Sequence, residues 1–305
     1  MAELRWPVKT REVFNHFIDS RAWNGFAFRD DDIIIATYAK SGTTWMQQIV
    51  SQLIFRGEEG IPIHTLSPWV DLRILPQERR DALELQTHRR FLKSHLPVDA
   101  LVFSPRARYI YIARDGRDAA WSFHNHLHNA DAEFFRMYNA DLPAGYPLLP
   151  QAPADPYEFY QRWLAEDGYP VWPFWENVRS WWACRMLPNV MLLHFNDLKA
   201  DLEGSIRRIA AFLGIAVDEA LLPRIVSHCS FDYMKANSAQ VTPRGGIGWK
   251  NGGDTFINKG VNGRWRDRLG AADIAAYEQR AVRELGPPCA RWLADGGLVM
   301  ASGPG

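Results

Sequence analysis

The chain has 305 residues, a length that suits one large domain or two small ones. Its 35 Lys and Arg residues balance 35 Asp and Glu residues, so it lacks the global basic field that drives sequence-independent binding to nucleic acids. Any site for an anion must therefore be local. Hydrophobic residues form 47% of the chain, which is enough for a sizeable core.

The cysteines and the hydropathy of the sequence indicate the cellular compartment in which the protein is expected. Cys184, Cys229 and Cys289 are widely spaced and form no CxxC motif, so the sequence suggests neither a disulfide framework nor a zinc site. The N-terminal segment has no continuous apolar run, and no stretch approaches the roughly 18 apolar residues of a membrane-spanning helix. We therefore expect a cytoplasmic protein without stable membrane insertion.

Three short apolar segments predict buried β-strands, each followed by a helical pattern. The strands are expected at residues 33–38, 109–113 and 190–195, where runs such as IIIATY are too short for a helix. Strands of this kind, separated by helices, indicate an α/β fold with a parallel sheet covered on both faces.

The rest of the pattern fits a single domain spanning residues 1–305, because no linker or repeat divides it. Further helices are expected at residues 172–187, 198–213, 218–227 and 271–285. Residues 129–173 are predicted to form an irregular cover, and the glycine-rich stretch at 244–263 is long enough to suggest a function. Residues 298–305 are expected to be a frayed tail.

The segment from Thr37 to Trp45, TYAKSGTTW, has the form of an anion-binding loop. A strand that runs through a Gly-containing turn into a helix directs unpaired N–H groups and the positive end of the helix toward one point. Lys40 adds a mobile charge, and the Ser and Thr hydroxyls that follow add short donors. The loop is not a Walker A sequence, because no Gly directly precedes Lys40. An ordinary turn with a Ser or Thr helix cap is the alternative.

A second candidate group lies in the segment FLKSHLP, at residues 91–97. Lys93 and His95 are two residues apart, so in an extended strand they would face the same side. Histidine has an unperturbed pKa that suits it to accept a proton near neutral pH. A hydrogen-bonded structural histidine is the alternative.

The segment YIYIARDGRD repeats the arrangement of strand, polar turn and helix. Arg114 at the strand end can bind phosphate in a bidentate manner, unless the arginines and aspartates here merely pair among themselves. His124, His126 and His128 follow on the predicted helix. This spacing places only the outer pair on one face and adds no carboxylate or Cys ligand, so we expect no metal site.

Taken together, these segments resemble the cytosolic-type sulfotransferases, which use 3'-phosphoadenosine 5'-phosphosulfate (PAPS) as donor. TYAKSGTTW is similar to the family's 5'-phosphosulfate loop, KSHLP to its KTHLP segment with the catalytic histidine, IARDGRDAAWS to its 3'-phosphate strand and helix, and NKGVNGRW to its C-terminal RKGxxGxW loop. The four motifs occur in the family's order over most of the chain. HRRFLKSHLP and SPWVD further resemble a bacterial branch that contains mycobacterial glycolipid sulfotransferases. The resemblance implies a single α/β domain related in shape to nucleotide kinases.

The resemblance also implies which residues bind PAPS and its product PAP. They come from three of the four motifs and three further positions, and are Lys40, Ser41, Gly42, Thr43, Thr44, Trp45, Arg114, Ser122, Phe195, Cys229, Phe231, Asn258, Lys259 and Gly260. In this assignment Arg114 and Ser122 hold the 3'-phosphate, Lys259 closes over it, and Trp45 stacks on adenine opposite Phe231.

Three of these positions depart from the family pattern. Asn258 replaces an Arg that binds phosphate, and the residues at 195 and 229 replace a Tyr and a Thr that contact the nucleotide. Arg264, Arg266 or Arg244 could replace the charge lost at Asn258. Each change weakens a contact of about 1 to 3 kcal/mol at most.

The implied reaction is in-line transfer of a sulfuryl group from PAPS to an acceptor hydroxyl, without a metal. His95 would remove the acceptor proton, Lys40 would stabilise the bridging oxygen, and Lys93 would assist at the sulfuryl group. One alternative is an ATP-dependent P-loop-like kinase in which Asp197 holds Mg²⁺. The other is a nucleotide-binding protein that has lost catalysis.

The aromatic residues suggest a small, hydrophobic acceptor, such as a phenol, an alcohol or a lipid. The relevant side chains are Trp69, Trp121, Phe123, Phe134, Phe135 and Tyr138. They could equally form the core, because periodicity does not separate a pocket from a core. A homodimer is possible, since no clear dimerisation motif decides the oligomeric state.

Overall fold

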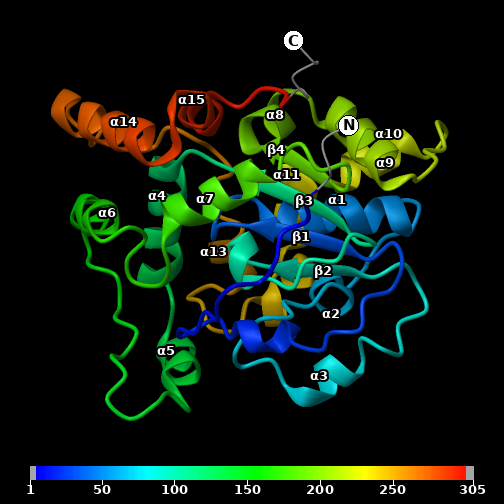
Figure 1. The fold of residues 1–305 in the computed structure, drawn as a ribbon, viewed down its shortest axis with the longest axis horizontal. Helices are drawn as coiled ribbons and strands as arrows, with labels where there is room; N and C mark the ends of the chain where they lie inside the picture. The colour runs from blue at the N-terminus through cyan, green and yellow to red at the C-terminus, as the bar shows by residue number, and fades with distance from the viewer. Residues whose placement is uncertain (1–4, 300–305) are drawn as a thin grey trace.

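A four-stranded parallel sheet lies at the centre of the structure, a computed structural model that describes residues 5–299 (Figure 1). Its strand order is β2 (Phe91–Ser94), β1 (Ile33–Thr37), β3 (Arg108–Ala113) and β4 (Val190–His194). The three strands predicted from the sequence are confirmed to within one residue at each end. The fourth, β2, is the short extended run of the FLKSHLP segment. The α/β fold with a parallel sheet is therefore confirmed.

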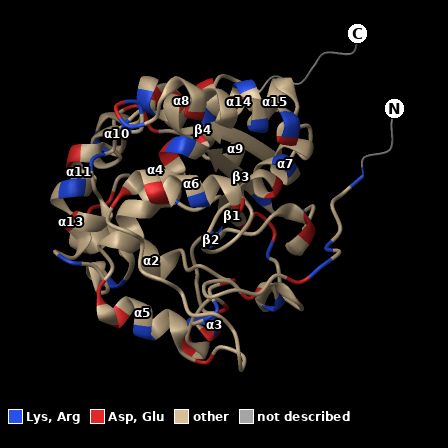
Figure 2. Ribbon diagram, turned by 90° about the vertical axis from the view of Figure 1, so that its left-hand side faces the viewer, with Lys and Arg blue, Asp and Glu red and all other residues tan. Residues whose placement is uncertain are grey.

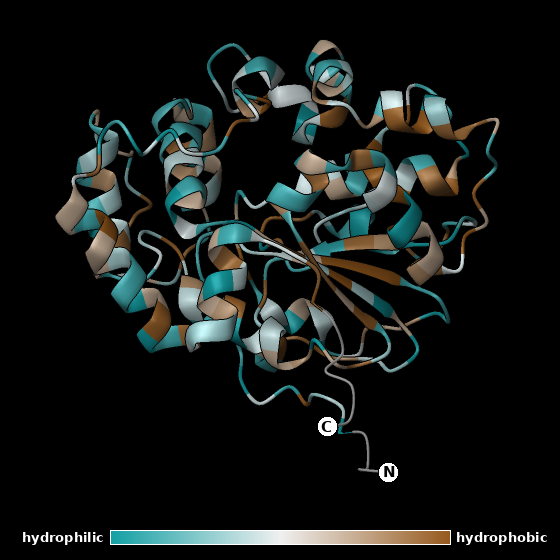
Figure 3. Cartoon of the chain, turned by 90° about the horizontal axis from the view of Figure 1, so that it is seen from above, coloured by the Kyte–Doolittle hydropathy of each residue, from teal (hydrophilic) through white to brown (hydrophobic). Residues whose placement is uncertain are grey.

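Both faces of the sheet are buried because alternate strand residues belong to different apolar clusters. Ile33 and Ile35 pack on one face with the helices α1 (Thr43–Ile54), α9 (Leu202–Leu213) and α10 (Leu222–His228). Ile34 and Ala36 pack on the other face with α4 (Gly116–His128), α6 (Pro156–Ala165), α7 (Phe174–Ala183), α14 (Ala271–Leu285) and α15 (Pro287–Asp295). Figure 3 shows the central strands as largely hydrophobic, with hydrophilic residues on the outer helices. This two-sided burial explains why the strands are nearly continuous apolar runs.

The remaining short elements lie in the connections. They are η1 (Ser20–Trp23), α2 (Ile63–Leu66), α3 (Gln77–Asp81), η2 (Val98–Ala100), α5 (Ala132–Asn139), α8 (Phe195–Ala200), α11 (Phe231–Ala236), α12 (Ser238–Val241), η3 (Pro243–Gly246) and α13 (Gly253–Phe256). Lys and Arg are interspersed with Asp and Glu over the helices in Figure 2, in line with the balanced charge of the chain.

Several predicted connections differ from the structure. The segment predicted to be irregular contains α5 and α6, and each begins at an Asp whose side chain accepts a backbone N–H. The helix predicted at 198–213 is interrupted at Asp201, which leaves helical geometry (φ −147°) and caps α9 by accepting the Gly204 N–H at 2.8 Å. The helix α15 was not predicted. The predicted frayed tail falls, from residue 300 onward, outside the described residues.

The strand register brings three of the predicted motifs, together with Phe195, to one edge of the sheet. Thr37 pairs with Ile112, and Ala113 pairs with His194, so the strands end at similar levels. The anion loop follows β1, His95 follows β2, Arg114 follows β3 and Phe195 follows β4. Ligands of open parallel sheets bind outside this carboxyl edge. Within residues 5–299, no helix has both the length and the apolar character needed to span a membrane.

Candidate active site

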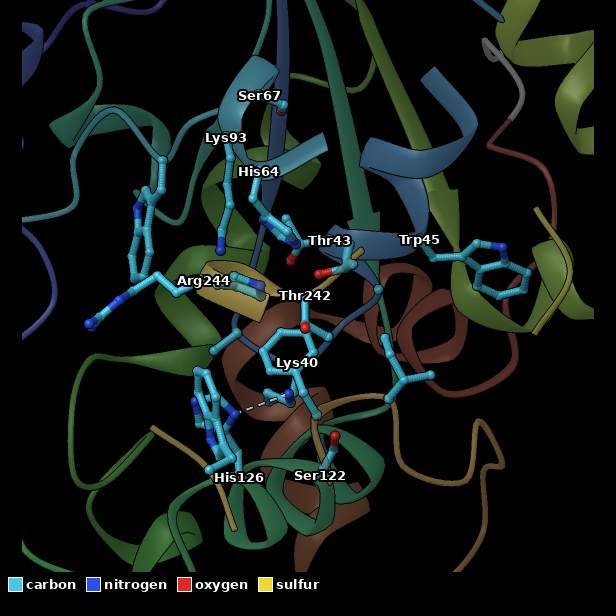
Figure 4. Close-up of a pocket in the computed structure, with 18 of the residues that line it drawn as sticks. Lys40, Thr43, Trp45, His64, Ser67, Lys93, Ser122, His126, Thr242 and Arg244 are labelled. Carbon is cyan, nitrogen blue, oxygen red and sulfur yellow. Dashed lines mark hydrogen bonds between the residues drawn. The ribbon is translucent and has the colours of Figure 1, made fainter. Parts of the chain in front are cut away.

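A cavity of about 1170 Å³ opens at the carboxyl edge of the sheet (Figure 4). Most of the predicted site residues line it: Lys40, Gly42, Thr43, Thr44, Trp45, Lys93, His95, Arg114, Ser122, Phe195, Phe231, Asn258, Lys259 and Gly260. Two predicted residues, Ser41 and Cys229, are buried and do not line it. Pockets for single ligands commonly measure about 300 to 1,000 Å³, so this cavity is larger than a typical pocket for one ligand.

The loop between β1 and α1 leaves the start of the helix open to a ligand. Gly42 occupies the N-cap position, and no side chain caps the first turn of α1. The Thr43 hydroxyl is instead 2.6 Å from the Thr37 hydroxyl beneath it. The alternative of a turn closed by a Ser or Thr cap is therefore wrong, and the uncapped N–H groups at the start of α1 remain available to an anion.

Gly42 is required both by its backbone angle and by its neighbours. Its φ is 110°, and a Cβ placed there would lie 2.9 Å from Ile112 Cδ1 and 3.1 Å from the Phe195 ring. We expect Gly42→Ala to lower the free energy of unfolding by about 1 to 3 kcal/mol and to weaken binding of PAP. Denaturant titration and calorimetry measure the two effects.

A matched control is Gly25→Ala. Gly25 also has a positive φ, of 73°, but a Cβ there would meet no atom within 4 Å. This variant isolates the backbone strain and should leave PAP affinity unchanged. Equal losses of stability and of PAP affinity in the two variants would contradict the proposed role of the Gly42 turn.

His95 is held as a neutral imidazole. Its Nδ1 lies 2.7 Å from the Thr37 carbonyl oxygen, which can only accept, so Nδ1 carries the proton and Nε2 is free to accept one. Burial, reinforced by the charge of Lys93, keeps its pKa well below the ordinary value. The ring stands edge-on to Trp69 at 4.7 Å and stacks near Trp172 at 5.7 Å. The structure therefore places a neutral imidazole between two tryptophan rings.

Lys93 also lies beside Trp69. Its Nζ is 4.4 Å from the centre of the indole ring, and burial lowers its pKa to about 8, although the carboxylate of Asp71 opposes the shift. Asp71 is itself buried and accepts the Ser94 hydroxyl at 2.7 Å. Its burial raises its pKa to about 6. Lys93 therefore places a positive charge with a lowered pKa close to the His95 imidazole.

Lys40 has few partners among residues 5–299. Its Nζ lies 3.4 Å from His126 Nδ1, the contact drawn as a dashed line in Figure 4, and 4.5 Å from the centre of the Phe256 ring. Burial, reinforced by the charges of Lys93 and Arg114, lowers its pKa to about 7. An anionic ligand would relieve this clustering of positive charge.

Arg114 is held by the glycine-rich C-terminal loop. Its Nε and Nη2 donate to Asn262 Oδ1 at 2.8 and 2.5 Å, while Nη1 donates to the Lys40 carbonyl and Nη2 to the Val261 carbonyl. The alternative of local pairing holds only for Arg117, which forms a buried ion pair with Asp115 at 2.7 Å. Arg114 thus joins the anion loop to the C-terminal loop.

The predicted adenine side is formed by aromatic rings around Trp45. Its indole N–H donates to the Cys229 carbonyl at 2.8 Å. Cys229 therefore holds the Trp45 ring through its backbone, whereas the residue itself is buried and does not line the cavity. Phe195 meets Trp45 edge-on at 5.3 Å. Phe231 is 39% exposed and packs against Gly260, where a Cβ would lie 2.5 Å from its ring. Trp45, Phe195 and Phe231 all line the cavity.

The predicted aromatic residues divide between cavity and core. Trp69, Phe123 and Tyr138 line the cavity, whereas Trp121 and the side chains at 134 and 135 do not. Trp172, which was not predicted, joins the lining. The lining of the cavity therefore includes a group of aromatic rings.

The three histidines of α4 are arranged as their spacing predicts. His124 and His128 stack at 5.3 Å on one face, and His124 Nε2 lies 2.8 Å from the Pro153 carbonyl oxygen. His126 instead lines the cavity beside Lys40. Sequence reasoning missed this role, as it missed Thr37 and Asn262, because each depends on a contact between segments far apart in the chain.

An uncapped helix start, a neutral histidine and clustered cations at the carboxyl edge of a parallel sheet are the features of an α/β protein that binds an anionic ligand. Residues 30–286 match the sequence family described as "Sulfotransferase domain". The chain belongs to the sulfotransferase family, as its motifs predicted, and is a sulfotransferase enzyme.

Individual relatives agree with this membership. A glycolipid sulfotransferase of Mycobacterium bovis is 32% identical over 306 residues, covering 92% of this chain and 93% of that protein. Human sulfotransferase 2B1 is 29% identical over 288 residues, covering 90% of this chain and 72% of that protein. The fold is similar to that of mouse sulfotransferase SULT7A1, solved with PAP, with a TM-score of 0.70, 23% identity, and coverage of 89% and 91% of the two chains.

Proposed function

We propose that this protein transfers a sulfuryl group from PAPS to the hydroxyl of a small hydrophobic acceptor. The observation that carries the proposal is that His95, with Nε2 free, lines the same cavity as Lys40, Lys93 and the uncapped start of α1. The mouse sulfotransferase of similar fold was solved with PAP, the product that PAPS leaves behind. The positive charges of Lys40, Lys93 and Arg114 and a helix start in one cavity fit a donor of this charge.

In the proposed reaction the acceptor oxygen bonds to sulfur as the bond from sulfur to the bridging oxygen of the donor breaks. His95 Nε2 takes the acceptor proton, and the Thr37 carbonyl holds the imidazolium that results. Lys40 stabilises the negative charge that grows on the bridging oxygen, and Lys93 contacts the sulfuryl oxygens. The N–H groups of α1 hold the 5'-phosphate throughout.

The cavity walls support an apolar acceptor. Trp69 and Trp172 flank His95, and Phe17, Phe123 and Tyr138 extend the aromatic surface. A phenol, an alcohol or a lipid with an apolar group next to its hydroxyl would be desolvated there without losing hydrogen bonds. Assays of labelled sulfuryl transfer from PAPS to phenols, steroids, fatty alcohols and glycolipids test this class.

Recognition of the donor is tested by comparing PAP with AMP, which lacks the 3'-phosphate. We expect calorimetry to show PAP binding at least about tenfold more tightly, a difference of about 1.4 kcal/mol. Equal affinities, or transfer from ATP with Mg²⁺ in place of PAPS, would favour the kinase alternative. PAP binding without transfer to any acceptor would favour the nucleotide-binding alternative.

A further inference from the structure

The C-terminal loop fixes Arg264 over the start of α4. The N–H of Gly263 donates to Asp118 Oδ1 at 2.7 Å, and the buried ring of Trp265 packs under the Arg117 guanidinium at 4.0 Å. Both chain neighbours of Arg264 are therefore held by residues in the first turn of this helix. The backbone of Arg264 is placed between them.

The Arg264 side chain is directed into the cavity without a partner. It lines the cavity and is half-buried, yet it makes no hydrogen bond or ion pair with any residue among 5–299. Two nearby arginines differ from Arg264 in their surroundings. Arg117 is paired with Asp115, and Arg266 is exposed and lines a separate pocket of about 360 Å³. A half-buried guanidinium with unused donors fits a site for an anion.

The surroundings of Arg264 are already positively charged. Burial, together with the charge of Arg264, lowers the pKa of Arg114 to about 10, although Asp118 opposes the shift. The charge of Arg264 also contributes to the lowered pKa of Lys40. One carboxylate, that of Asp118, faces Arg114 and Arg264, and it already accepts the N–H of Gly263. A ligand with more than one negative charge would balance this cluster.

Arg114 has little capacity left for a ligand. Its contacts with Asn262, Val261 and Lys40 use every N–H of its guanidinium except one on Nη1. Arg264 has all of its N–H groups free. Strong binding of a phosphate beside Arg114 therefore needs either a shift of the C-terminal loop or a further cation. Lys259 in that loop lines the cavity but is exposed, whereas Arg264 is half-buried there and supplies a second guanidinium without any shift.

We propose that Arg264 binds the phosphate on the 3' position of the donor ribose, together with Arg114 and Ser122. Ser122 lies four residues after Asp118, on the same face of α4, and lines the cavity. This inference rests on the proposed donor. It assigns the main phosphate contact to a residue that follows the glycine of the C-terminal loop.

The experiment compares PAP and AMP binding by calorimetry in the wild type, Arg264→Gln and Arg266→Gln. Loss of a charge-assisted contact predicts that Arg264→Gln weakens PAP binding about 10- to 100-fold and AMP binding less than about threefold. Arg266→Gln should bind both as the wild type does. The inference would be overturned if Arg264→Gln lost affinity for PAP and AMP equally, or lost no affinity for PAP.

Thermal unfolding without nucleotide separates binding from folding. Because Arg264 has like charges nearby and no partner among the described residues, Arg264→Gln should unfold at a temperature no lower than that of Arg266→Gln. A clearly lower temperature would assign Arg264 a structural role and overturn the inference. A wild type that prefers PAP, with an Arg264→Gln variant that keeps the preference, refutes only the role of Arg264. A wild type that binds PAP and AMP equally refutes the proposed donor as well.

Discussion

Replacing His95 with Ala is expected to lower kcat by about 10²- to 10⁴-fold while leaving PAP affinity within about twofold of the wild type. His95 contacts Thr37 and the two flanking tryptophans, and none of these is a proposed donor contact. Steady-state kinetics with a good acceptor and calorimetry with PAP measure the two quantities. The substitution should therefore separate chemistry from donor binding.

The control for this variant is His64→Asn. His64 also lines the cavity, but its Nε2 contacts the Val241 carbonyl oxygen, and it has no role in the proposed reaction. Its replacement should leave kcat within a few-fold of the wild type. If His95→Ala retains more than about a third of the wild-type kcat, the acceptor proton goes to another group.

The pH profile gives an independent check on His95. Because burial keeps its pKa well below the ordinary value, the free imidazole stays unprotonated as the pH falls below 6.5. The acid limb of kcat/KM should therefore lie below pH 6.5. A limb centred at the ordinary histidine pKa would show that the base is not this buried ring.

The sequence predicted those parts of the site whose geometry depends on residues close together in the chain. The apolar run of β1, the glycine at position 42 and the helix after it form one continuous segment, so their geometry follows from short-range preferences. Arg114 was found for the same reason, because it directly follows β3. The parallel register then brought the two segments to one edge.

Contacts between distant segments could not be predicted in this way. The Asn262 bond to Arg114 spans 148 residues, and the His95 bond to Thr37 spans 58. Helical periodicity likewise could not show that Phe123 faces the cavity while Trp121, on the same helix, packs 5.2 Å from Tyr160. Each of these contacts depends on which helix, strand or loop packs against the residue in the folded chain.

Replacing Lys40 with Met is expected to impair both chemistry and binding. Lys40 follows β1 at the edge of the anion loop, so it can contact the donor in the ground state. The charge that it faces grows as the bridging oxygen leaves, which makes its interaction stronger in the transition state. Lys40→Met should therefore lower kcat by a larger factor than it weakens PAPS binding.

The pH dependence of PAP binding should change in the same variant. With a pKa of about 7 in the free protein, Lys40 loses its proton as the pH rises above 7, whereas a bound phosphate raises its pKa. PAP binding above pH 7 thus takes up a proton, and its affinity falls by up to about tenfold per pH unit. Lys93, with a pKa of about 8, contributes at higher pH in both proteins. The decrease in PAP affinity between pH 7 and pH 8 should therefore be smaller in Lys40→Met than in the wild type.

The comparison of PAP with PAPS decides what Lys40 does. PAP carries the full charge on its 5'-phosphate, whereas in PAPS part of that charge is shared with the sulfuryl group, so the loss of an ammonium group should weaken PAP binding more. Dissociation constants for both ligands, in the wild type and in Lys40→Met, measure this difference. If Lys40→Met weakens the binding of PAP and of PAPS by the same factor, Lys40 binds the ground state and the transition state alike. The leaving-group role would then pass to Lys93, the other cavity lysine that lies beside His95 and Trp69.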